Sequence, residues 1–350
     1  MRDGLLVPQP IPELAIMPTS SQALDILRAD EEARPWLDYL ATLEPASVPI
    51  TVPDDAELGE RLAWCDVPDD VIPEIVAVAR QIETDPDLAW LFDRTIAYLE
   101  SGLDHWEWPP QIPPLTGLTD EVSRWFFAVV YAAFLPVTLD LHRKRGISKE
   151  ISQATMADIG RHVRIHQMRL GVPGLASPDW LWLHARGMIF QIGRLQFERA
   201  ALGGTTSRAL QAQGFDCQHR EPCLAVHIPS FMGPLTPEVC DASFAQAREF
   251  FAAHFPTETF RLAVCRSWLL DEQLARFLPP TSNIVQFQQR FGIAYRAEKP
   301  EDGDTLDFIF RSPNVPLDQL PQRTTLERAV VRHLQAGGHF HGAMGWIPLT

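Results

Sequence analysis

The turn after residues 224–229 carries the clearest chemical signal in this sequence. Side chains alternate up to Pro229 as they do in a strand, and Gly233 and Pro234 then break the pattern. Thr236 stands where a helix N-cap belongs, with Pro237 at the first helical position. Backbone N–H groups at such a turn lack partners and lie at the positive end of the helix dipole. We therefore predict a site for an anion such as the pyrophosphate of a coenzyme.

A second set of polar side chains alternates along one predicted strand. Arg194, Gln196 and Glu198 point to the same face, because side chains two residues apart in a strand share a face. Leu195 and Phe197 supply the opposite, apolar face. The polar face either lines a cleft between domains or is exposed to solvent, and the pattern favours neither alternative.

Histidines suggest metal sites, but their spacing argues against metal. Asp158, His162 and His166 form a row on one helix face, yet the ends of the row are about 12 Å apart at 1.5 Å per residue. We expect this polar face to lie against the second domain. In the cysteine and histidine group that ends with Cys223 and His227, those two residues are about 13 Å apart if extended, too far for one zinc ion. No metal ligand is assigned.

The cysteines are better explained as core residues than as nucleophiles. Cys265 and Ser267 share a strand face, so either side chain could donate a hydrogen bond to a thioester. A separate reading is a cysteine hydrolase, in which His227 would have to lie within hydrogen-bond reach of Cys265. It would need a histidine partner and a lowered thiol pKa, and the sequence indicates neither. The chain has five scattered cysteines, which predicts reduced, buried thiols rather than a disulfide framework.

The periodicity of the sequence changes near residue 172. Before it, apolar residues recur at helical spacing. Helices are expected to begin at Ser20 or Ser21, to cover 68–82 and 85–99, to run from Thr119 past Pro136, and to run from Ser148 to about Leu170. After Pro178 the expected strands are 188–198, 224–229, 260–268, 284–295, 305–310 and 339–347, and the expected helices are 236–254, 271–277 and 325–335. This order predicts an α+β fold: an N-terminal extension with helices (1–45), a helical domain (46–172) and a mixed-sheet domain with flanking helices (173–350).

Composition narrows the classes of partner. The chain has 350 residues and a formal net charge of -15, so nucleic acid and anionic membrane are not expected as partners. The apolar run 125–139 is too short to span a bilayer and is interpreted as a buried helix. Because the first residues lack the apolar core of a signal peptide, we expect a cytoplasmic location. The oligomeric state is left open.

Five motifs resemble a known family. They are residues 161–170 (RHVRIHQMRL), 194–198 (RLQFE), 226–238 (VHIPSFMGPLTPE), 267–271 (SWLLD) and 278–290 (LPPTSNIVQFQQR). The chain is similar over about residues 45–347 to actinobacterial acyltransferase-domain proteins, in which a helical N-acyltransferase N-terminal domain precedes a GNAT-like C-terminal domain. The resemblance implies transfer of an acyl group from acetyl-CoA or another acyl-CoA to the amine of a small molecule.

The resemblance also implies a geometry. The strand that ends at Pro229 should diverge from the strand that ends at Trp268, and the pantetheine arm of coenzyme A should occupy the gap. The residues predicted to bind the coenzyme are Ile228, Ser230, Met232, Gly233 and Leu235. The predicted catalytic residues are His227, Glu198, Ser267 and Tyr295. His227 would act as the base, and a hydroxyl group would protonate the leaving thiolate. Arg194, Gln196 and His166 are predicted to bind the acceptor.

One departure from the wider GNAT superfamily bears on this prediction. That superfamily usually has an Arg/Gln-x-x-Gly-x-Gly/Ala turn, whereas Ser230–Leu235 here contains only Gly233. Fewer residues of such a turn adopt a positive φ easily. Phe231 or Met232 would fill the coenzyme slot if their side chains pointed into it. The alternative reading is therefore a GNAT-like protein that has lost catalysis and serves in binding or interaction.

Overall fold

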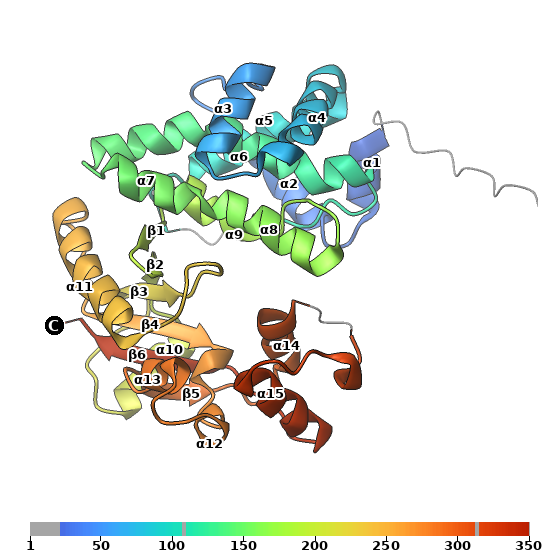
Figure 1. Cartoon of the computed structure of the whole chain (residues 1–350). Helices are drawn as coiled ribbons and strands as arrows, with labels where there is room; N and C mark the ends of the chain where they lie inside the picture. The colour runs from blue at the N-terminus through green and yellow to red at the C-terminus, as the bar shows by residue number, and fades with distance from the viewer. Residues whose placement is uncertain (1–21, 107–109, 312–314, 350) are drawn as a thin grey trace, which may run out of the picture.

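The computed structural model describes residues 22–106, 110–311 and 315–349, which form a helical lobe and a sheet lobe (Figure 1). The predicted Ser20 or Ser21 helix start lies outside these residues. The helical lobe contains α1 Ala23–Ala29, α2 Arg34–Thr42, α3 Asp55–Trp64, η2 Asp69–Val71, α4 Ile72–Thr84, α5 Pro86–Ser101, α6 Asp120–Lys144, α7 Lys149–Met156, α8 Asp158–Leu170 and α9 Pro178–Ala185. The predicted α+β fold is confirmed.

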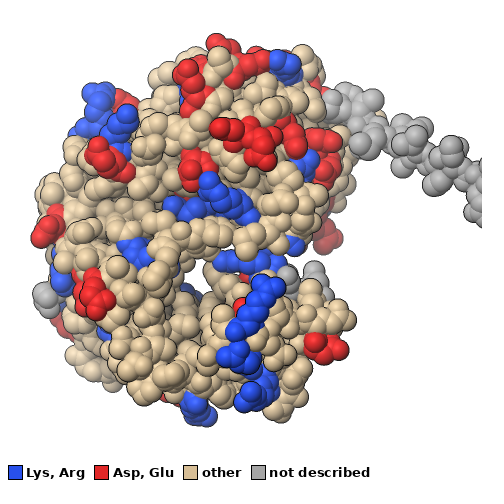
Figure 2. Space-filling model, in the orientation of Figure 1, with Lys and Arg blue, Asp and Glu red and all other residues tan. Residues whose placement is uncertain are grey.

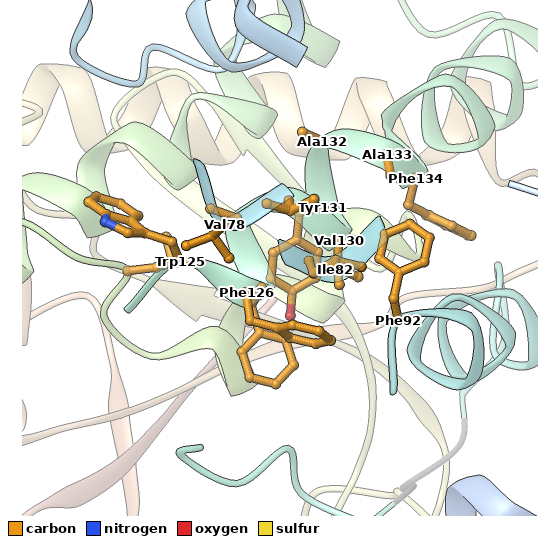
Figure 3. Packing of buried hydrophobic residues seen from close by; sticks show 14 of the residues in the cluster. Val78, Ile82, Phe92, Trp125, Phe126, Val130, Tyr131, Ala132, Ala133 and Phe134 are labelled. Carbon is orange, nitrogen blue, oxygen red and sulfur yellow. The ribbon is translucent and has the colours of Figure 1, made fainter. Parts of the chain in front are cut away.

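Helix α6 is the centre of the helical lobe. Thr119 caps it by accepting a hydrogen bond from the N–H of Val122, and the helix continues through Pro136. By length and composition α6 resembles a membrane span, but 72% of its most apolar window is buried inside the protein. Figure 3 shows Phe126, Tyr131 and neighbouring side chains packed against residues of α4 and α5. The expected buried helix is confirmed.

The segment predicted as one helix from Ser148 is two helices, α7 and α8, which meet at Ala157. Gly160, in the first turn of α8, donates its N–H to the carbonyl of Cys65 at 3.2 Å. A Cβ atom at this position would lie 1.9 Å from the carbonyl oxygen of Asp66. Only glycine therefore lets α8 approach the 65–66 loop, and this contact sets its direction over the sheet lobe. Gly171, with φ +76°, ends the helix as predicted.

The sheet lobe has one six-stranded sheet in the order β1-β2-β3-β4-β6-β5. Its elements are β1 Ile189–Ile192, β2 Leu195–Ala201, α10 Gly204–Ala212, β3 Pro222–His227, α11 Pro237–His254, β4 Leu262–Ser267, η3 Trp268–Leu270, α12 Leu274–Phe277, α13 Asn283–Gln288, β5 Gly292–Arg296, α14 Asp302–Phe310, η4 Leu317–Gln319, α15 Thr325–Gln335 and β6 Ala343–Pro348. All pairings are antiparallel except that of β3 with β4.

Three predicted strands differ from the structure. Segment 188–198 is a hairpin of β1 and β2, because Gly193 (φ +60°) allows a two-residue turn between paired Ile192 and Leu195. In segment 284–295 the hydroxyl of Ser282 caps α13, and only the last residues form β5. Segment 305–310 belongs to α14. The first turn of this helix contains Asp302 and Asp304, whose negative charges stabilise a helix N-terminus.

Helix α11 confirms the prediction made from its spacing. It spans Pro237–His254 after Thr236, and its apolar stripe of Cys240, Phe244, Ala247 and Phe251 is buried against the inner face of the sheet. A phenylalanine side chain removed from water contributes about 1.5–3 kcal/mol to folding. The stripe therefore fixes the first turn of α11 at the end of β3.

An ion-pair cluster around the buried Arg199 connects the lobes. Asp104, which follows α5, forms ion pairs with Arg145 and with Arg199 of β2, and Arg199 also pairs with Glu258. Arg199 is 3% exposed, so its charge is neutralised almost entirely by these carboxylates. Since breaking a buried pair leaves an uncompensated charge, this cluster resists separation of the lobes.

The buried His142 on α6 makes folding stability depend on pH. Its Nδ1 lies 3.0 Å from Ser152 Oγ, and burial, helped by the charge of His184, lowers the pKa of His142 from 6.5 to about 4. Between these pH values the unfolded chain binds a proton that the folded protein does not, so stability falls as the pH falls. The full difference is about 3 kcal/mol.

We expect His142→Gln to remove much of the loss of unfolding free energy between pH 7 and pH 4, measured by urea denaturation at both pH values. The exposed His219 serves as the control, and His219→Gln should leave that loss unchanged. An unchanged loss in the His142 variant would show that this imidazole does not carry the effect.

Candidate active site

The parallel strands β3 and β4 diverge after two residue pairs, Leu224 with Ala263 and Ala225 with Val264. On its other edge β3 stays paired with β2 as far as His227, and β4 stays paired with β6 as far as Ser267. The gap therefore opens only between β3 and β4, toward their carboxyl ends. This confirms the predicted divergence.

A cavity of about 570 Å³ occupies the gap and continues beneath the helical lobe. Helices α8 and α9 form its roof, β2, β3 and β4 its floor, and α14 one side. Figure 2 shows a hollow between the lobes with basic side chains gathered around it. The arginines that line the cavity are Arg161, Arg169, Arg194, Arg266 and Arg311.

The turn between β3 and α11 presents unpaired backbone N–H groups. Within the described residues, no acceptor pairs with the N–H of Ile228, Ser230, Phe231, Gly233 or Leu235. Phe231 (φ +62°) and Gly233 (φ +77°) are both left-handed, so Phe231 takes a conformation that glycine normally provides. Successive turns of this kind direct N–H groups toward one point and form anion-binding concavities.

Arg194 and Arg311 support this turn. Arg194 donates from Nε to the carbonyl of Gly233 at 2.9 Å and from Nη1 to that of Pro229 at 3.2 Å. Among the described residues it has no carboxylate partner, so its charge remains available to an anion. Arg311, at the end of α14, donates to the Ser230 hydroxyl. Arg194 thus lies at the coenzyme turn, whereas the sequence had suggested acceptor binding.

The side chains of Phe231 and Met232 do not plug the gap. Phe231 is 52% exposed and does not line the cavity, and Met232 lies with its sulfur 3.6 Å from Arg161 Nη1. Ile228 and Ser230 line the cavity, whereas Met232, Gly233 and Leu235 do not, and Leu235 packs into the core. The coenzyme roles of these three residues stay predictions that rest on their backbone.

His227 and Glu198 form a polar pair at the cavity. His227 Nε2 lies 2.8 Å from Glu198 Oε2, and both side chains are partly shielded from solvent. Because a carboxylate only accepts hydrogen bonds, His227 donates its Nε2–H, which leaves a lone pair on Nδ1. The Trp180 ring packs edge-on against the imidazole with 4.6 Å between ring centroids. This arrangement suits a general base.

Buried Asp158 positions the residues around His227. It accepts hydrogen bonds from Arg161 Nε at 2.5 Å and from Trp180 Nε1 at 3.0 Å, and lies 3.0 Å from His184 Nε2. His184 in turn lies 3.2 Å from the amide nitrogen of Gln196, which pairs with His227 in the ladder. Burial alone raises the pKa of Asp158, but His184, His162 and Arg161 outweigh burial and hold the pKa well below its usual range.

The family matches agree with this geometry. The family described as N-acyltransferase N-terminal domain matches residues 56–187, and that described as GNAT-like C-terminal domain matches residues 189–347. A solved acyltransferase in complex with decanoyl-CoA and teicoplanin is 34% identical, with 95% of this chain and 99% of that chain covered and a TM-score of 0.84. The chain belongs to this acyltransferase family.

Two further solved structures are similar to this acyltransferase. A mutant acyltransferase in complex with octanoyl-CoA has a TM-score of 0.85, and an acyltransferase in complex with CoA and 10C-teicoplanin has a TM-score of 0.84. Each is 34% identical and covers 95% of this chain and 99% of its own. No curated protein matches the chain.

The two family matches meet beside residue 188, after the end of α9. Helix α9 packs into the helical core. The boundary expected from the sequence is residue 172.

Ser267 and Cys265 of this acyltransferase both line the cavity, but only Ser267 suits a chemical role. Ser267 lines the cavity, and its oxygen accepts a hydrogen bond from the N–H of Leu269 at 3.1 Å, so its hydroxyl proton is free to donate. Cys265 also lines the cavity, but burial raises its thiol pKa to about 12 and no hydrogen bond joins it to His227. A cysteine hydrolase is therefore not supported.

Tyr295 and His166 are not at the cavity. Tyr295 lies on the edge strand β5, separated from the gap by β6 and β4. His166 turns toward the end of its helix, where Nδ1 lies 2.8 Å from the carbonyl of Val172. Neither residue lines either of the two main cavities among the described residues, so their predicted roles are not supported. No group of three or more potential metal ligands occurs in the described part of the chain.

Sequence reasoning missed Trp180 and His184, both on α9. The signal for this helix is Ser177, Pro178 and Asp179, a polar residue and a proline at a helix start followed by an acidic residue. This helix was not predicted because the apolar periodicity changes toward that of strands after Pro178. Asp158 was identified only as part of a polar row, because its partners on α9 are distant in sequence.

Two ion pairs on α8 allow a matched test of the Asp158 network. Asp158→Asn should lower the unfolding free energy by about 3–5 kcal/mol, because it leaves the buried Arg161 without its counter-charge. The Arg164 pair with Asp66, whose side chain is 58% exposed, is the control, and Asp66→Asn should cost no more than about 1 kcal/mol. Urea denaturation measures both, and equal losses would contradict a structural role for Asp158.

Proposed function

We propose that this acyltransferase moves an acyl group from an acyl-CoA to the primary amine of a small molecule, and that glycopeptides of the teicoplanin type are candidate acceptors. The divergence of β3 and β4 beside the unpaired turn carries the proposal. The divergent strands supply backbone groups for the pantetheine arm, and the turn supplies N–H groups for the pyrophosphate. Similar structures contain decanoyl-CoA, octanoyl-CoA and teicoplanin, which supports acyl-CoA as donor and suggests the acceptor class.

Electrostatics supports an anionic donor. The chain carries a net charge of -15, yet five arginines line the cavity. Several of these are neutralised by carboxylates, Arg161 by Asp158 and Arg266 by Glu301. Arg194, which lacks a carboxylate partner among the described residues, lies against the turn. The free cation and the unpaired N–H groups therefore coincide where the phosphates of coenzyme A would bind.

The chemical steps follow from the positions of His227, Glu198 and Ser267. Glu198 accepts a hydrogen bond from the Nε2–H of His227, so Nδ1 is left to accept a proton from the acceptor ammonium, directly or through water. The neutral amine attacks the thioester carbonyl, whose oxygen is stabilised by an unpaired N–H such as that of Ile228. The C–S bond then breaks, the amide keeps the acyl group, and its nitrogen releases the surplus proton to solvent. The thiolate takes a proton from the imidazolium, or from the hydroxyl of Ser267, which is then reprotonated through water.

An inactive binding protein is the less favoured alternative. That reading rested on the shortage of glycine in the turn. Phe231 supplies the second left-handed residue, so the backbone has the required shape without a second glycine.

We expect decanoyl-CoA at 100 times its dissociation constant to raise the unfolding free energy by about 2.7 kcal/mol, measured by thermal unfolding. With teicoplanin stripped of its acyl chain as acceptor, mass spectrometry should detect the acylated product. His227→Ala should lower kcat by about 10²- to 10⁴-fold, since it removes the base. His219→Ala, outside the cavities, is the control. Failure of every acyl-CoA to stabilise the protein would refute the proposal.

Arg194→Ala should weaken acyl-CoA binding by about 10- to 100-fold, because one charge-assisted contact contributes about 1.5–3 kcal/mol. Arg248 on the outer face of α11 is exposed and does not line the cavity, so Arg248→Ala should leave the dissociation constant unchanged. Titration calorimetry with coenzyme A measures both. Equal effects of the two variants would mean that Arg194 contributes to coenzyme affinity only through the net charge of the protein and makes no direct contact.

A further inference from the structure

A second cavity of about 330 Å³ adjoins the first. Asp179 and Trp180 of α9 line both cavities, so they form the partition between two compartments of one cleft. The polar pair also stands at this boundary, because His227 lines the larger cavity and Glu198 the smaller one, with 2.8 Å between Nε2 and Oε2. A ligand in the smaller cavity therefore meets this pair on the side of the Glu198 carboxylate.

Aromatic rings and carboxylates together define the chemistry of the smaller cavity. Trp106, Trp180 and Trp182 contribute its aromatic wall. Asp179 accepts a hydrogen bond from the side-chain amide of Gln111 at 2.9 Å, and His227 is the one hydrogen-bond partner of the Glu198 carboxylate within the described residues. Among the described residues, neither carboxylate has an arginine or lysine partner.

The basic residues at this cavity do not cancel these charges. Arg199 is already paired with Asp104 and Glu258, and Arg220 is at the exposed rim. Aromatic faces beside uncompensated carboxylates attract organic cations, through the ring quadrupole and through charge-assisted hydrogen bonds. An acyl tail would instead press methylene groups against two carboxylates and remove water from them, which is unfavourable.

We propose that the smaller cavity is the acceptor subsite and binds a protonated primary amine carried on a ring, with the ring against the tryptophans and the ammonium group between Asp179 and Glu198. The assignment to the acceptor rests on the proposed acyl transfer. The binding of a ring-bearing ammonium does not, and it can be tested alone.

Benzylamine and benzyl alcohol are matched probes, since they share a ring and differ in charge at pH 7. Ligand-observed NMR should show benzylamine binding the full-length protein about fivefold more tightly than benzyl alcohol, the factor expected from one cation contact. Asp179→Asn should reduce this preference, because Glu198 and the tryptophans remain, while leaving benzyl alcohol binding unchanged. Equal binding of both probes by the unmodified protein, or an unchanged preference in the variant, would overturn the proposal.

Ala200, on the β2 floor of the smaller cavity, locates the site. Ala200→Phe should fill the cavity and eliminate benzylamine binding, whereas Ala200→Ser, which adds one atom, should preserve it. Dissociation constants for acetyl-CoA and decanoyl-CoA should be unchanged in both variants. If Ala200→Phe weakened decanoyl-CoA selectively, the cavity would hold the acyl tail and the proposal would be wrong.

Thermal unfolding establishes that the two Ala200 variants are folded, and Asp179→Asn provides a test that does not depend on filling the cavity. Absence of acyl-CoA binding in the unmodified protein would refute the proposed function, while the benzylamine result would still decide whether the cavity recognises an ammonium group. The two failures are therefore distinguishable.

Discussion

The site depends on one local constraint, the loss of pairing between β3 and β4 after two residue pairs. Inside a sheet, backbone N–H and C=O groups normally satisfy each other, and leaving them unpaired is costly. Here β2 and β6 hold the outer edges of the two strands, so the opening does not spread through the sheet. The exposed backbone at this opening suits an extended ligand that itself carries amide groups, as pantetheine does.

The helical lobe contributes directly to the site. Gly160 brings α8 against the 65–66 loop and thereby sets the position of Asp158 above the sheet. Asp158 then joins α8 to Trp180 and His184 of α9, and Trp180 packs on the imidazole of His227. A chain of contacts thus runs from a glycine in one lobe to the proposed base in the other. The acyltransferase fold alone would not ensure that geometry.

The sequence was most informative where the local signal was strong. Pro237 and the apolar stripe up to Phe251 defined α11, and the turn before it followed from Gly233 and Pro234. Prediction was wrong for 305–310, where alternating apolar residues resembled a strand but Leu306 and Ile309 pack into the sheet-lobe core at helical spacing. The hairpin turn at Gly193 was missed because Gly193 and Arg194 occupy only two positions between apolar residues.

For the site, strand alternation correctly placed Gln196 and Glu198 on one face, and Glu198 meets His227 from the neighbouring strand. No pattern within β5 could show that Tyr295 lies two strands away from the gap, since strand order is a property of the folded sheet. The partners of Asp158 were equally hidden, because contacts between distant helices leave no periodic trace in the sequence.

The left-handed backbone at Phe231 bears on how this protein can be re-engineered. Glycine, asparagine and aspartate adopt that conformation with less strain than phenylalanine, and half of the Phe231 side chain is already in solvent. The ring is therefore expendable for the shape of the loop. Exchanging it is a conservative way to alter the hydrophobicity of this turn without unwinding the helix that follows.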